Sequence, residues 1–226
     1  MPPTAIVTGH SSGLGRAISE QLLDRGWHVI GVSRRPAPVP FVDSSRLTEV
    51  HGSVVDPSTI NSAFAHAERG GDLRLVVNCA GQGVFGEAGS YSATDVMSAL
   101  EGNLAGLILF SDRAVKQMAE NGGDIVNVMS TAAKKLRPAE TVYTAAKWGA
   151  KGYTRALREA VKAQKLKIRI FEAYPCGMNT PFWQTAVRPV ADGKSFPEPG
   201  PIAGSILKAV FGKDTSYQQE LTFERS

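Results

Sequence analysis

Cysteine and histidine are scarce in this chain, which limits the chemistry that metals or disulfides could provide. The two cysteines, Cys79 and Cys176, form neither a zinc-binding pattern nor the disulfide framework of a small secreted domain. The four histidines are scattered along 226 residues without the spacing of metal ligands. We therefore expect no metal site.

Long apolar segments are also missing. No run approaches the roughly 20 apolar residues that a membrane-spanning helix requires. The amino-terminal residues, Met-Pro-Pro-Thr-Ala-Ile-Val, lack the basic region and long apolar stretch of a signal peptide. We expect a cytoplasmic protein without a membrane partner.

The positive charge of the chain is mild and dispersed. Lysine and arginine together number 25 against 21 acidic residues, a net charge of +4. They form no long run and no DNA- or RNA-binding signature, so we expect no nucleic-acid partner. A mildly basic protein fits a phosphate-bearing cofactor equally well.

What the sequence does contain is a regular alternation of short apolar segments and helical patterns. Nearly continuous apolar strands indicate a parallel sheet with helices on both faces, and no repeat or linker divides the chain. We predict a single doubly wound, Rossmann-type α/β domain over residues 1–226. Strands are expected at 5–8, 28–33, 48–52, 73–78, 124–130, 167–174 and 220–224, and helices at 17–23, 60–69, 93–102, 104–121, 143–164 and 202–211.

A glycine-rich turn follows the first predicted strand at once. Glycines at this place let the chain turn tightly and let the backbone approach a pyrophosphate at the start of a helix, although such a turn can also serve packing alone. No Lys-Ser/Thr pair follows as in a Walker loop, so ATP hydrolysis is not expected. The predicted phosphate-binding residues are Gly9, Ser11, Ser12, Gly13, Leu14 and Gly15.

Tyr143 and Lys147 are four residues apart in a predicted helix, which places their side chains on one face. An ammonium close to a phenol lowers the pKa of the phenol. Such a tyrosine could exchange a proton with a substrate oxygen at neutral pH. Taken alone, a pair with this spacing is more often a solvated helix face.

Six features of this chain directly follow predicted strands, at the sheet edge where doubly wound folds bind ligands: Gly9–Gly15, Arg34, Asp56, Asn78–Gly81, Ser130 and Pro175–Thr180. Together the motifs resemble the short-chain dehydrogenase/reductase family over nearly the whole chain, most of all its small sepiapterin- or benzil-reductase-like branch. They are Thr8-Gly-x-x-x-Gly-x-Gly15, Asn78-x-Ala-Gly81, Asn103, Ser130 and Tyr143-x-x-x-Lys147.

The resemblance implies hydride transfer between a nicotinamide and the carbon of a small carbonyl or alcohol substrate. Tyr143 would exchange the proton, and Ser130 would hold the substrate oxygen and stabilise its charge. Lys147 would bind the nicotinamide ribose and lower the pKa of Tyr143. Asn103 would hold a water that links Lys147 to solvent, with a helix-kinking or capping role as its alternative.

The residues after the second predicted strand favour NADP(H) over NAD(H). An NAD enzyme places a carboxylate there for the ribose 2′-hydroxyl, whereas arginine accommodates a 2′-phosphate. Ser33 stands in place of the acid, and Arg34 follows it. A guanidinium can bind phosphate in a fork geometry, so we assign this role to Arg34 rather than to Arg35, which could be a solvated loop charge.

The resemblance implies further cofactor contacts. Asp56 corresponds to an aspartate that recognises the adenine amino group, and Pro57 after it has no N–H for the usual second contact. Cys176 replaces a family glycine, and Cys79 reads as a small filler rather than a reactive thiol. The remaining expected cofactor-binding residues are Asn78, Ala80, Gly81, Pro175, Gly177 and Thr180.

Substrate signals are fewer. Phe182 and Trp183 begin a proline- and glycine-rich loop, about 181–200, that we predict to be a substrate lid, and they suggest an apolar or aromatic carbonyl compound. The basic cluster Lys134, Lys135 and Arg137 could attract an anion or simply be solvated.

Three further expectations concern the protein as a whole. A non-catalytic NADP(H)-binding regulator is the alternative function, although it would be expected to have lost the serine, tyrosine or lysine. An epimerase or dehydratase would need a larger substrate portion than this chain has. Family habit implies a homodimer or homotetramer through the helices at 104–121 and 143–164.

Overall fold

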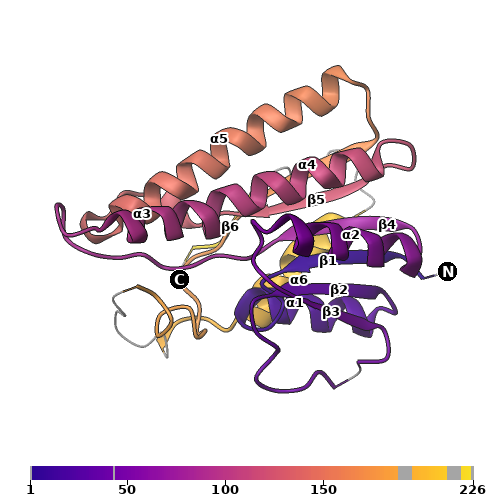
Figure 1. The fold of residues 1–226 in the computed structure, drawn as a ribbon, viewed down its shortest axis with the longest axis horizontal. Coiled ribbons are helices and arrows are strands. Elements are labelled where there is room, and N and C mark those ends of the chain that lie inside the picture. The colour runs from indigo at the N-terminus through magenta and orange to yellow at the C-terminus, as the bar shows by residue number, and fades with distance from the viewer. Residues whose placement is uncertain (1, 43, 188–194, 213–219, 225–226) are drawn as a thin grey trace.

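The computed structural model describes residues 2–42, 44–187, 195–212 and 220–224, which form a parallel sheet covered by helices (Figure 1). Its seven strands have the order β3-β2-β1-β4-β5-β6-β7, and each neighbouring pair is parallel. The strands are β1 Thr4–Thr8, β2 His28–Ser33, β3 Leu47–His51, β4 Leu73–Asn78, β5 Gly123–Val128, β6 Ile168–Tyr174 and β7 Glu220–Thr222. The predicted doubly wound fold is confirmed.

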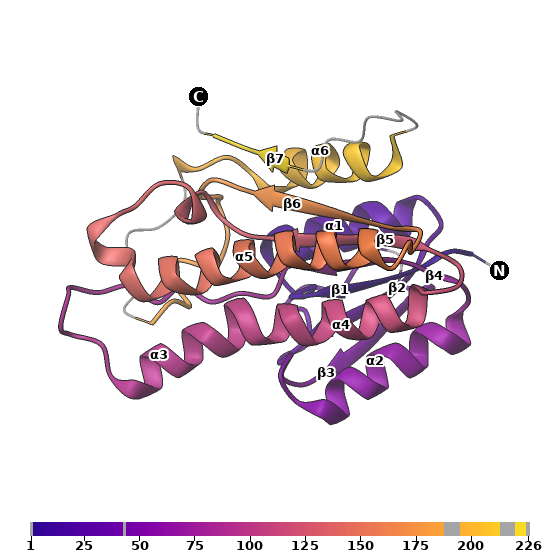
Figure 2. The ribbon, with the colours of Figure 1, turned by 90° about the horizontal axis from the view of Figure 1, so that it is seen from above.

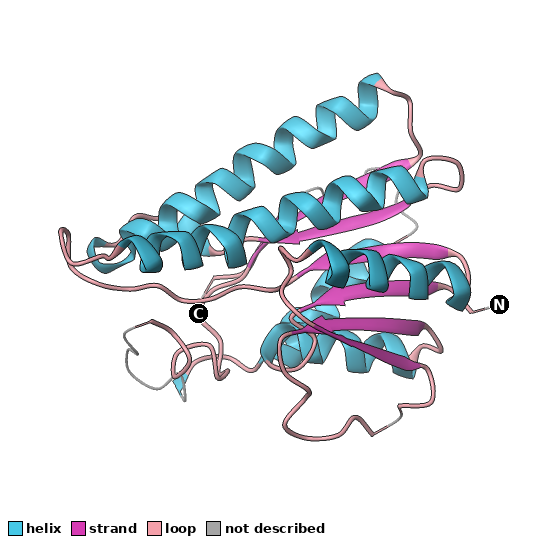
Figure 3. Ribbon diagram, viewed as in Figure 1, coloured by secondary structure: helices cyan, strands magenta, loops and turns pink. Residues whose placement is uncertain are grey.

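Helices cover both faces of the sheet, as Figures 2 and 3 show. Helices α1 and α6 lie on one face, and α2, α4 and α5 lie on the other. Their bounds are α1 Gly13–Asp24, α2 Pro57–Gly70, α3 Ala93–Leu100, α4 Gly106–Met118, α5 Thr141–Ala163 and α6 Pro199–Phe211. Within the described residues, no helix has the length and apolar character that crossing a membrane requires.

Alternate residues of each strand enter two different cores, because successive side chains point to opposite faces of a sheet. Val7 of β1 packs in the core under α1 and α6 with Leu22, whereas its neighbour Ile6 packs under α2 and α4. Phe64 and Phe110 anchor that second core, with ring centroids 5.7 Å apart. All of these side chains are fully buried, so the register of the central strands is fixed by both faces at once.

One local feature differs from the expected helix pattern. The two helices predicted at 93–102 and 104–121 are joined without a break, because a π-helical turn over Glu101–Ala105 connects α3 to α4. Asn103 lies in that turn and is buried. Such turns often mark functional positions within helices.

The sheet places its ligand-binding edge at the carboxyl end of β1. Chain order reverses there, because β2 lies on one side of β1 and β4 on the other. The loops that leave β1 and β4 diverge at such a point and leave a crevice between them. Part of the predicted lid, residues 188–194, lies outside the described residues.

Candidate active site

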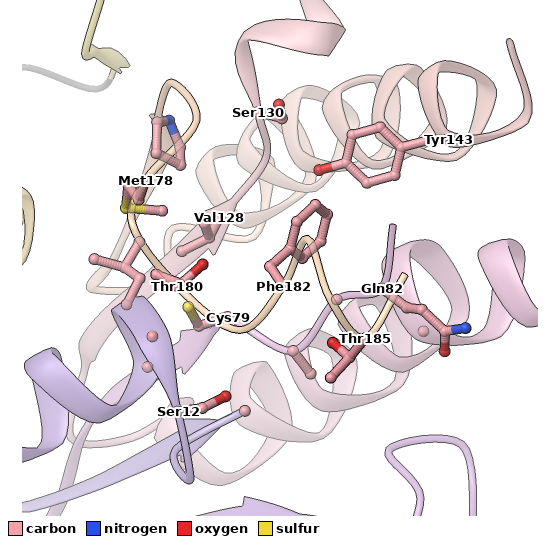
Figure 4. A pocket seen from close by; sticks show the side chains of 18 of the residues that line it. Ser12, Cys79, Gln82, Val128, Ser130, Tyr143, Met178, Thr180, Phe182 and Thr185 are labelled. Atoms are coloured by element: carbon pink, nitrogen blue, oxygen red, sulfur yellow. The ribbon is translucent and has the colours of Figure 1, made fainter. Parts of the chain in front are cut away.

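A cavity of about 490 Å³ opens along the carboxyl edge of the sheet. It extends from the loop after β1 to the loop after β6, and α5 forms one wall (Figure 4). Its size is in the range of cofactor and small-molecule sites. The predicted site residues that line it are Gly9, Ser11, Ser12, Gly13, Leu14, Gly15, Arg34, Ala80, Gly81, Ser130, Tyr143, Lys147, Pro175, Gly177 and Thr180.

The glycine turn is shaped by close backbone contacts. Gly9 and Gly13 have positive φ angles of 73° and 54°, which side chains rarely adopt. A Cβ on Gly15 would lie 2.3 Å from the carbonyl oxygen of Gly9. Ser12 precedes α1 without a side-chain hydrogen bond to the helix. The turn therefore presents the amino end of α1 to the cavity, a geometry that fits a phosphate group.

The loop after β6 closes against this turn. A Cβ on Gly13 would lie 3.2 Å from Thr180 Cγ2, so these residues face each other across a narrow gap. Cys176 is buried in the core beneath α1 and α6. Neither Cys176 nor Gly177 has a positive φ, so the backbone tolerates a side chain where the family has glycine.

Ser130, Tyr143 and Lys147 meet at the other end of the cavity. Tyr143 and Lys147 lie one turn apart near the start of α5, and both are nearly inaccessible to solvent. Lys147 Nζ lies 5.8 Å from the centroid of the Tyr143 ring and donates a hydrogen bond of 3.1 Å to the Val128 carbonyl oxygen. The Tyr143 hydroxyl points into the cavity (Figure 4).

Ser130 is held in place by the backbone that follows it. Its Oγ accepts a hydrogen bond of 3.1 Å from the N–H of Ala132, and its hydroxyl lies close enough to Tyr143 to affect the pKa of that phenol. The serine thus sits within reach of the same substrate oxygen that Tyr143 would contact. An oxygen bound between the two hydroxyl groups would have two donors, as a developing alkoxide requires.

Burial dominates the electrostatics of the pair. It raises the pKa of Tyr143 above its ordinary value, and the nearby Ser130 hydroxyl acts in the opposite direction. Burial lowers the pKa of the Lys147 ammonium to about 8. The pKa of Tyr143 is therefore shifted in the direction opposite to the expected one, because desolvation of the phenolate is the largest contribution to it.

Cys79 also lines the cavity, with its sulfur directed inward (Figure 4). Burial raises the pKa of its thiol to about 12, although the charge of Lys147 acts in the opposite direction. A thiol is a poor nucleophile while it stays protonated. This environment agrees with the interpretation of Cys79 as a filler.

Asp56 does not lie where the resemblance placed it. Its carboxylate caps α2 and accepts hydrogen bonds from the Ser58 N–H at 3.0 Å and from the hydroxyl groups of Ser58 and Thr59. It does not line the cavity, whereas Ser53 and Val54 do. The Asp-Pro pair at the start of a helix is an N-cap followed by proline at the first helical position, a signal that could have revealed this role.

Asn78 supports the sheet rather than the cavity. Its buried amide donates hydrogen bonds to Ser111 Oγ at 2.9 Å and to Asn127 Oδ1 at 2.8 Å. These bonds connect β4 to α4 and β5, and Asn78 does not line the cavity. The Asn78 side chain is therefore not placed to contact a cofactor directly.

Asn103 fixes the loop that carries Gly81. Its Oδ1 accepts from the N–H of Gln82 at 3.2 Å, and its Nδ2 donates to the carbonyl oxygens of Gln82 and Ala99. A Cβ on Gly81 would lie 2.8 Å from Asn103 Oδ1 and 3.6 Å from Lys147 Nζ. Asn103 is thus close to Lys147, but its side-chain amide is already hydrogen-bonded to backbone groups. This agrees with the alternative, a structural role for Asn103 where the helix is irregular.

The basic residues near the cavity have different settings. Arg34 and Arg35 are exposed and line both the main cavity and an adjoining one of about 360 Å³. Lys134 instead pairs with Glu220, and Lys135 pairs with Glu224 at 2.9 Å. The basic cluster, for which an anion site and a solvated loop were both open, is therefore divided, and of Lys134, Lys135 and Arg137 only Arg137 lines the cavity.

Two aromatic residues of the cavity were not anticipated. Phe85 follows β4, Phe196 precedes α6, and both line the cavity together with the expected Phe182 and Trp183. No motif marks either position. Among the described residues, no group of three or more histidine, cysteine or acidic side chains is placed to hold a metal.

Sequence comparison identifies the family to which this chain belongs. The model of the short chain dehydrogenase family matches residues 3–190. Carbonyl reductase family member 4 of Danio rerio is 30% identical over 217 residues, covering 92% of this chain and 90% of that protein. An uncharacterised oxidoreductase of Schizosaccharomyces pombe is 31% identical over 181 residues, which cover 78% of this chain and 61% of that protein.

Solved structures share the fold over nearly the full length. A short-chain dehydrogenase/reductase of Vibrio parahaemolyticus superposes with a TM-score of 0.84 at 26% identity, covering 98% of this chain and 96% of that one. An alcohol dehydrogenase of Thermococcus sibiricus in complex with 5-hydroxy-NADP has a TM-score of 0.85 at 21% identity, covering 100% of this chain and 99% of that one. With the family match, these likenesses show that the chain is an oxidoreductase of the short-chain dehydrogenase/reductase family.

Proposed function

We propose that this protein is an NADP(H)-dependent oxidoreductase that interconverts a carbonyl group and a secondary alcohol. The observation that carries the proposal is the convergence of Ser130, Tyr143 and Lys147 on a cavity that begins at the glycine turn. The catalytic groups and the phosphate-binding turn lie at opposite ends of one cavity, as a dinucleotide that reaches the reacting carbon requires.

The residues present fit such a dinucleotide. The close backbone packing around Gly9 and Gly15 leaves no room for side chains, and both glycines line the cavity at the amino end of α1, where a helix attracts phosphate. We assign the 2′-phosphate to Arg34, with Arg35 beside it, and we assign the adenine side to Ser53 and Val54 in place of Asp56. Bound nicotinamide would supply or accept the hydride.

Side chains of the protein donate the proton and stabilise the charge that develops during the reaction. Tyr143 stays protonated because burial raises its pKa, so in the direction of reduction its hydroxyl can donate a proton to the substrate oxygen. Ser130 donates a hydrogen bond to the same oxygen. The Lys147 ammonium, with a pKa of about 8, supplies positive charge that favours the tyrosinate left behind.

A panel of carbonyl compounds scored by loss of NADPH absorbance tests this proposal. We expect turnover of at least one ketone or aldehyde, together with measurable NADPH binding by isothermal calorimetry. Tight NADPH binding without turnover across the whole panel would favour the alternative, a non-catalytic regulator.

Three further points are part of the proposal. We take residues 1–226 to form one domain, with the segment about 181–200 as its lid, in the cytoplasm. We also propose a homodimer or homotetramer formed through α4 and α5, where Leu109 and Trp148 expose 41% and 45% of their surface. Sedimentation velocity on the purified protein would contradict this assembly if it gave a monomer at micromolar concentration.

A further inference from the structure

Five aromatic rings form one wall of the cavity at its catalytic end. The rings of this aromatic wall contact one another with centroid separations between 5.2 and 6.1 Å. They come from the loop after β4, from α5 and from the described residues on either side of 188–194. The members are Phe85, Tyr143, Phe182, Trp183 and Phe196.

The base of the aromatic wall is fixed by hydrogen bonds. Val84 and Val187 form a parallel bridge, and the Val187 N–H donates to the Gly83 carbonyl oxygen at 2.9 Å. The indole N–H of Trp183 donates to the Met178 carbonyl oxygen at 2.9 Å. With its polar group satisfied, Trp183 stacks on Phe85 at 5.8 Å and 15°. These two rings therefore present a defined apolar surface.

Phe182 differs from the other members because its ring lies against three of them edge to face. It meets Tyr143 at 5.9 Å and 62°, and Trp183 at 5.3 Å and 86°. It also meets Phe85 at 6.1 Å and 71°, and it projects into the cavity beside Tyr143 (Figure 4). Aromatic pairs prefer this geometry. The protein's own side chain thus shows that a six-membered aromatic ring fits next to the catalytic hydroxyl.

Apart from Lys147, whose Nζ donates to the Val128 carbonyl oxygen, the basic side chains near this place are paired, which favours an uncharged occupant. Arg137 lines the cavity, but it pairs with Glu140 at 3.1 Å. Lys134 and Lys135 pair with carboxylates near the end of the chain and do not line the cavity. A carboxylate on the substrate would have to compete with Glu140 for Arg137.

From this geometry we propose that the substrate is an uncharged ketone whose carbonyl is attached to an aromatic ring, and that this ring takes the place of Phe182. The inference rests on the proposed function for its chemistry. Phe182 swings aside when the substrate binds, and the aryl ring makes the contacts with Phe85 and Trp183 that Phe182 gives up. The carbonyl carbon accepts hydride from NADPH, and the carbonyl oxygen receives the proton of Tyr143.

A matched pair of ketones tests the inference. Acetophenone and cyclohexyl methyl ketone have the same carbon skeleton and differ in the aromaticity of the ring. Binding of each to the NADP⁺-loaded protein is measured by ligand-observed NMR, and turnover is measured by NADPH oxidation. The preference for acetophenone is compared between wild type and variants, so that the different intrinsic reactivity of the two ketones cancels.

Two substitutions in the aromatic wall should act in opposite directions. Trp183→Leu should reduce the preference for acetophenone about two- to tenfold, because an aromatic contact is lost while apolar surface remains. Phe182→Ala should tighten acetophenone binding by about the same factor, because the competing ring is gone. Phe211→Ala is the control, since it removes a ring that contacts Trp27 away from the cavity.

The outcomes separate the two proposals. Equal binding of both ketones to wild type, or a preference that Trp183→Leu leaves unchanged, would overturn the aryl ketone assignment even if both ketones are reduced. Weaker acetophenone binding in Phe182→Ala would show that Phe182 is part of the wall rather than a stand-in, and would overturn the binding place. Preferential binding of acetophenone without turnover of any carbonyl would support the aryl site and count against the reductase.

Discussion

The two ends of the cavity are built from different parts of the polypeptide. At the glycine turn the surface is mainly backbone, and the packing is so close that a Cβ on Gly15 would meet the carbonyl oxygen of Gly9 and a Cβ on Gly9 would meet the backbone of Ala80. At the catalytic end the surface consists of side chains, with Tyr143 and the rings of the aromatic wall. A backbone surface suits phosphates, which every dinucleotide carries, whereas a surface of side chains can change with the substrate.

The largest expected effect, on kcat, comes from a substitution that changes only the catalytic end of the cavity. Tyr143→Phe removes the proton donor and keeps the ring that packs on Phe85, so kcat should fall about 10²- to 10⁴-fold while NADPH binding stays within about twofold. Steady-state kinetics and calorimetry measure the two quantities. Tyr153→Phe is the matched control, because that hydroxyl donates to the Ile108 carbonyl oxygen at 3.3 Å and does not line the cavity. Retained turnover in Tyr143→Phe would remove the assigned proton donor.

A substitution in the glycine turn should mainly weaken NADPH binding, whereas Tyr143→Phe should mainly lower kcat. Gly15→Ala places a methyl group 2.3 Å from a backbone oxygen, so the turn must shift, at a typical cost of about 1–3 kcal/mol. We expect NADPH affinity to fall about ten- to a hundredfold, and thermal stability to decrease. Calorimetry and thermal unfolding measure both.

Gly152→Ala serves as the control for that substitution. Gly152 lies within α5, and apart from the adjacent backbone of that helix no atom of the described residues lies within 4 Å of a Cβ built on it. Alanine there should stabilise the helix by up to about 1 kcal/mol and leave NADPH affinity unchanged. Equal NADPH affinity in Gly15→Ala and wild type would contradict the phosphate-binding role of the turn.

The same difference between the two ends decides what the sequence could reveal. Backbone approaches require glycine, and glycine at Gly9, Gly13 and Gly15 is visible directly after a predicted strand. The aromatic wall leaves no such pattern, because Phe85 and Phe196 are separated by more than a hundred residues and come to line the same cavity only in the folded chain.

The errors in the sequence reading also have physical reasons. Asp56 was assigned to adenine because it follows a predicted strand, but that strand ends at His51, and the aspartate already belongs to the cap of α2. The direction of the Tyr143 pKa could not be read from its spacing to Lys147. Spacing gives proximity, whereas the pKa also depends on burial, which is a property of the whole fold.

The smallest expected effect concerns the open edge of the cavity, where exposed side chains rather than backbone would contact the cofactor. Substituting them tests how the protein distinguishes NADPH from NADH. Arg34 and Arg35 line the same two cavities, so geometry alone does not rank them, and our assignment of the 2′-phosphate to Arg34 depends on its position directly after Ser33.

A hydrogen bond to a charged group contributes about 1.5–3 kcal/mol, and exposure to solvent places this one at the lower end. Arg34→Ala should therefore weaken NADPH about tenfold and NADH less than twofold, and Arg35→Ala should weaken NADPH by a smaller factor. Equal losses of NADPH and NADH in Arg34→Ala would show that the guanidinium does not recognise the phosphate, and a larger loss in Arg35→Ala would transfer the role to its neighbour.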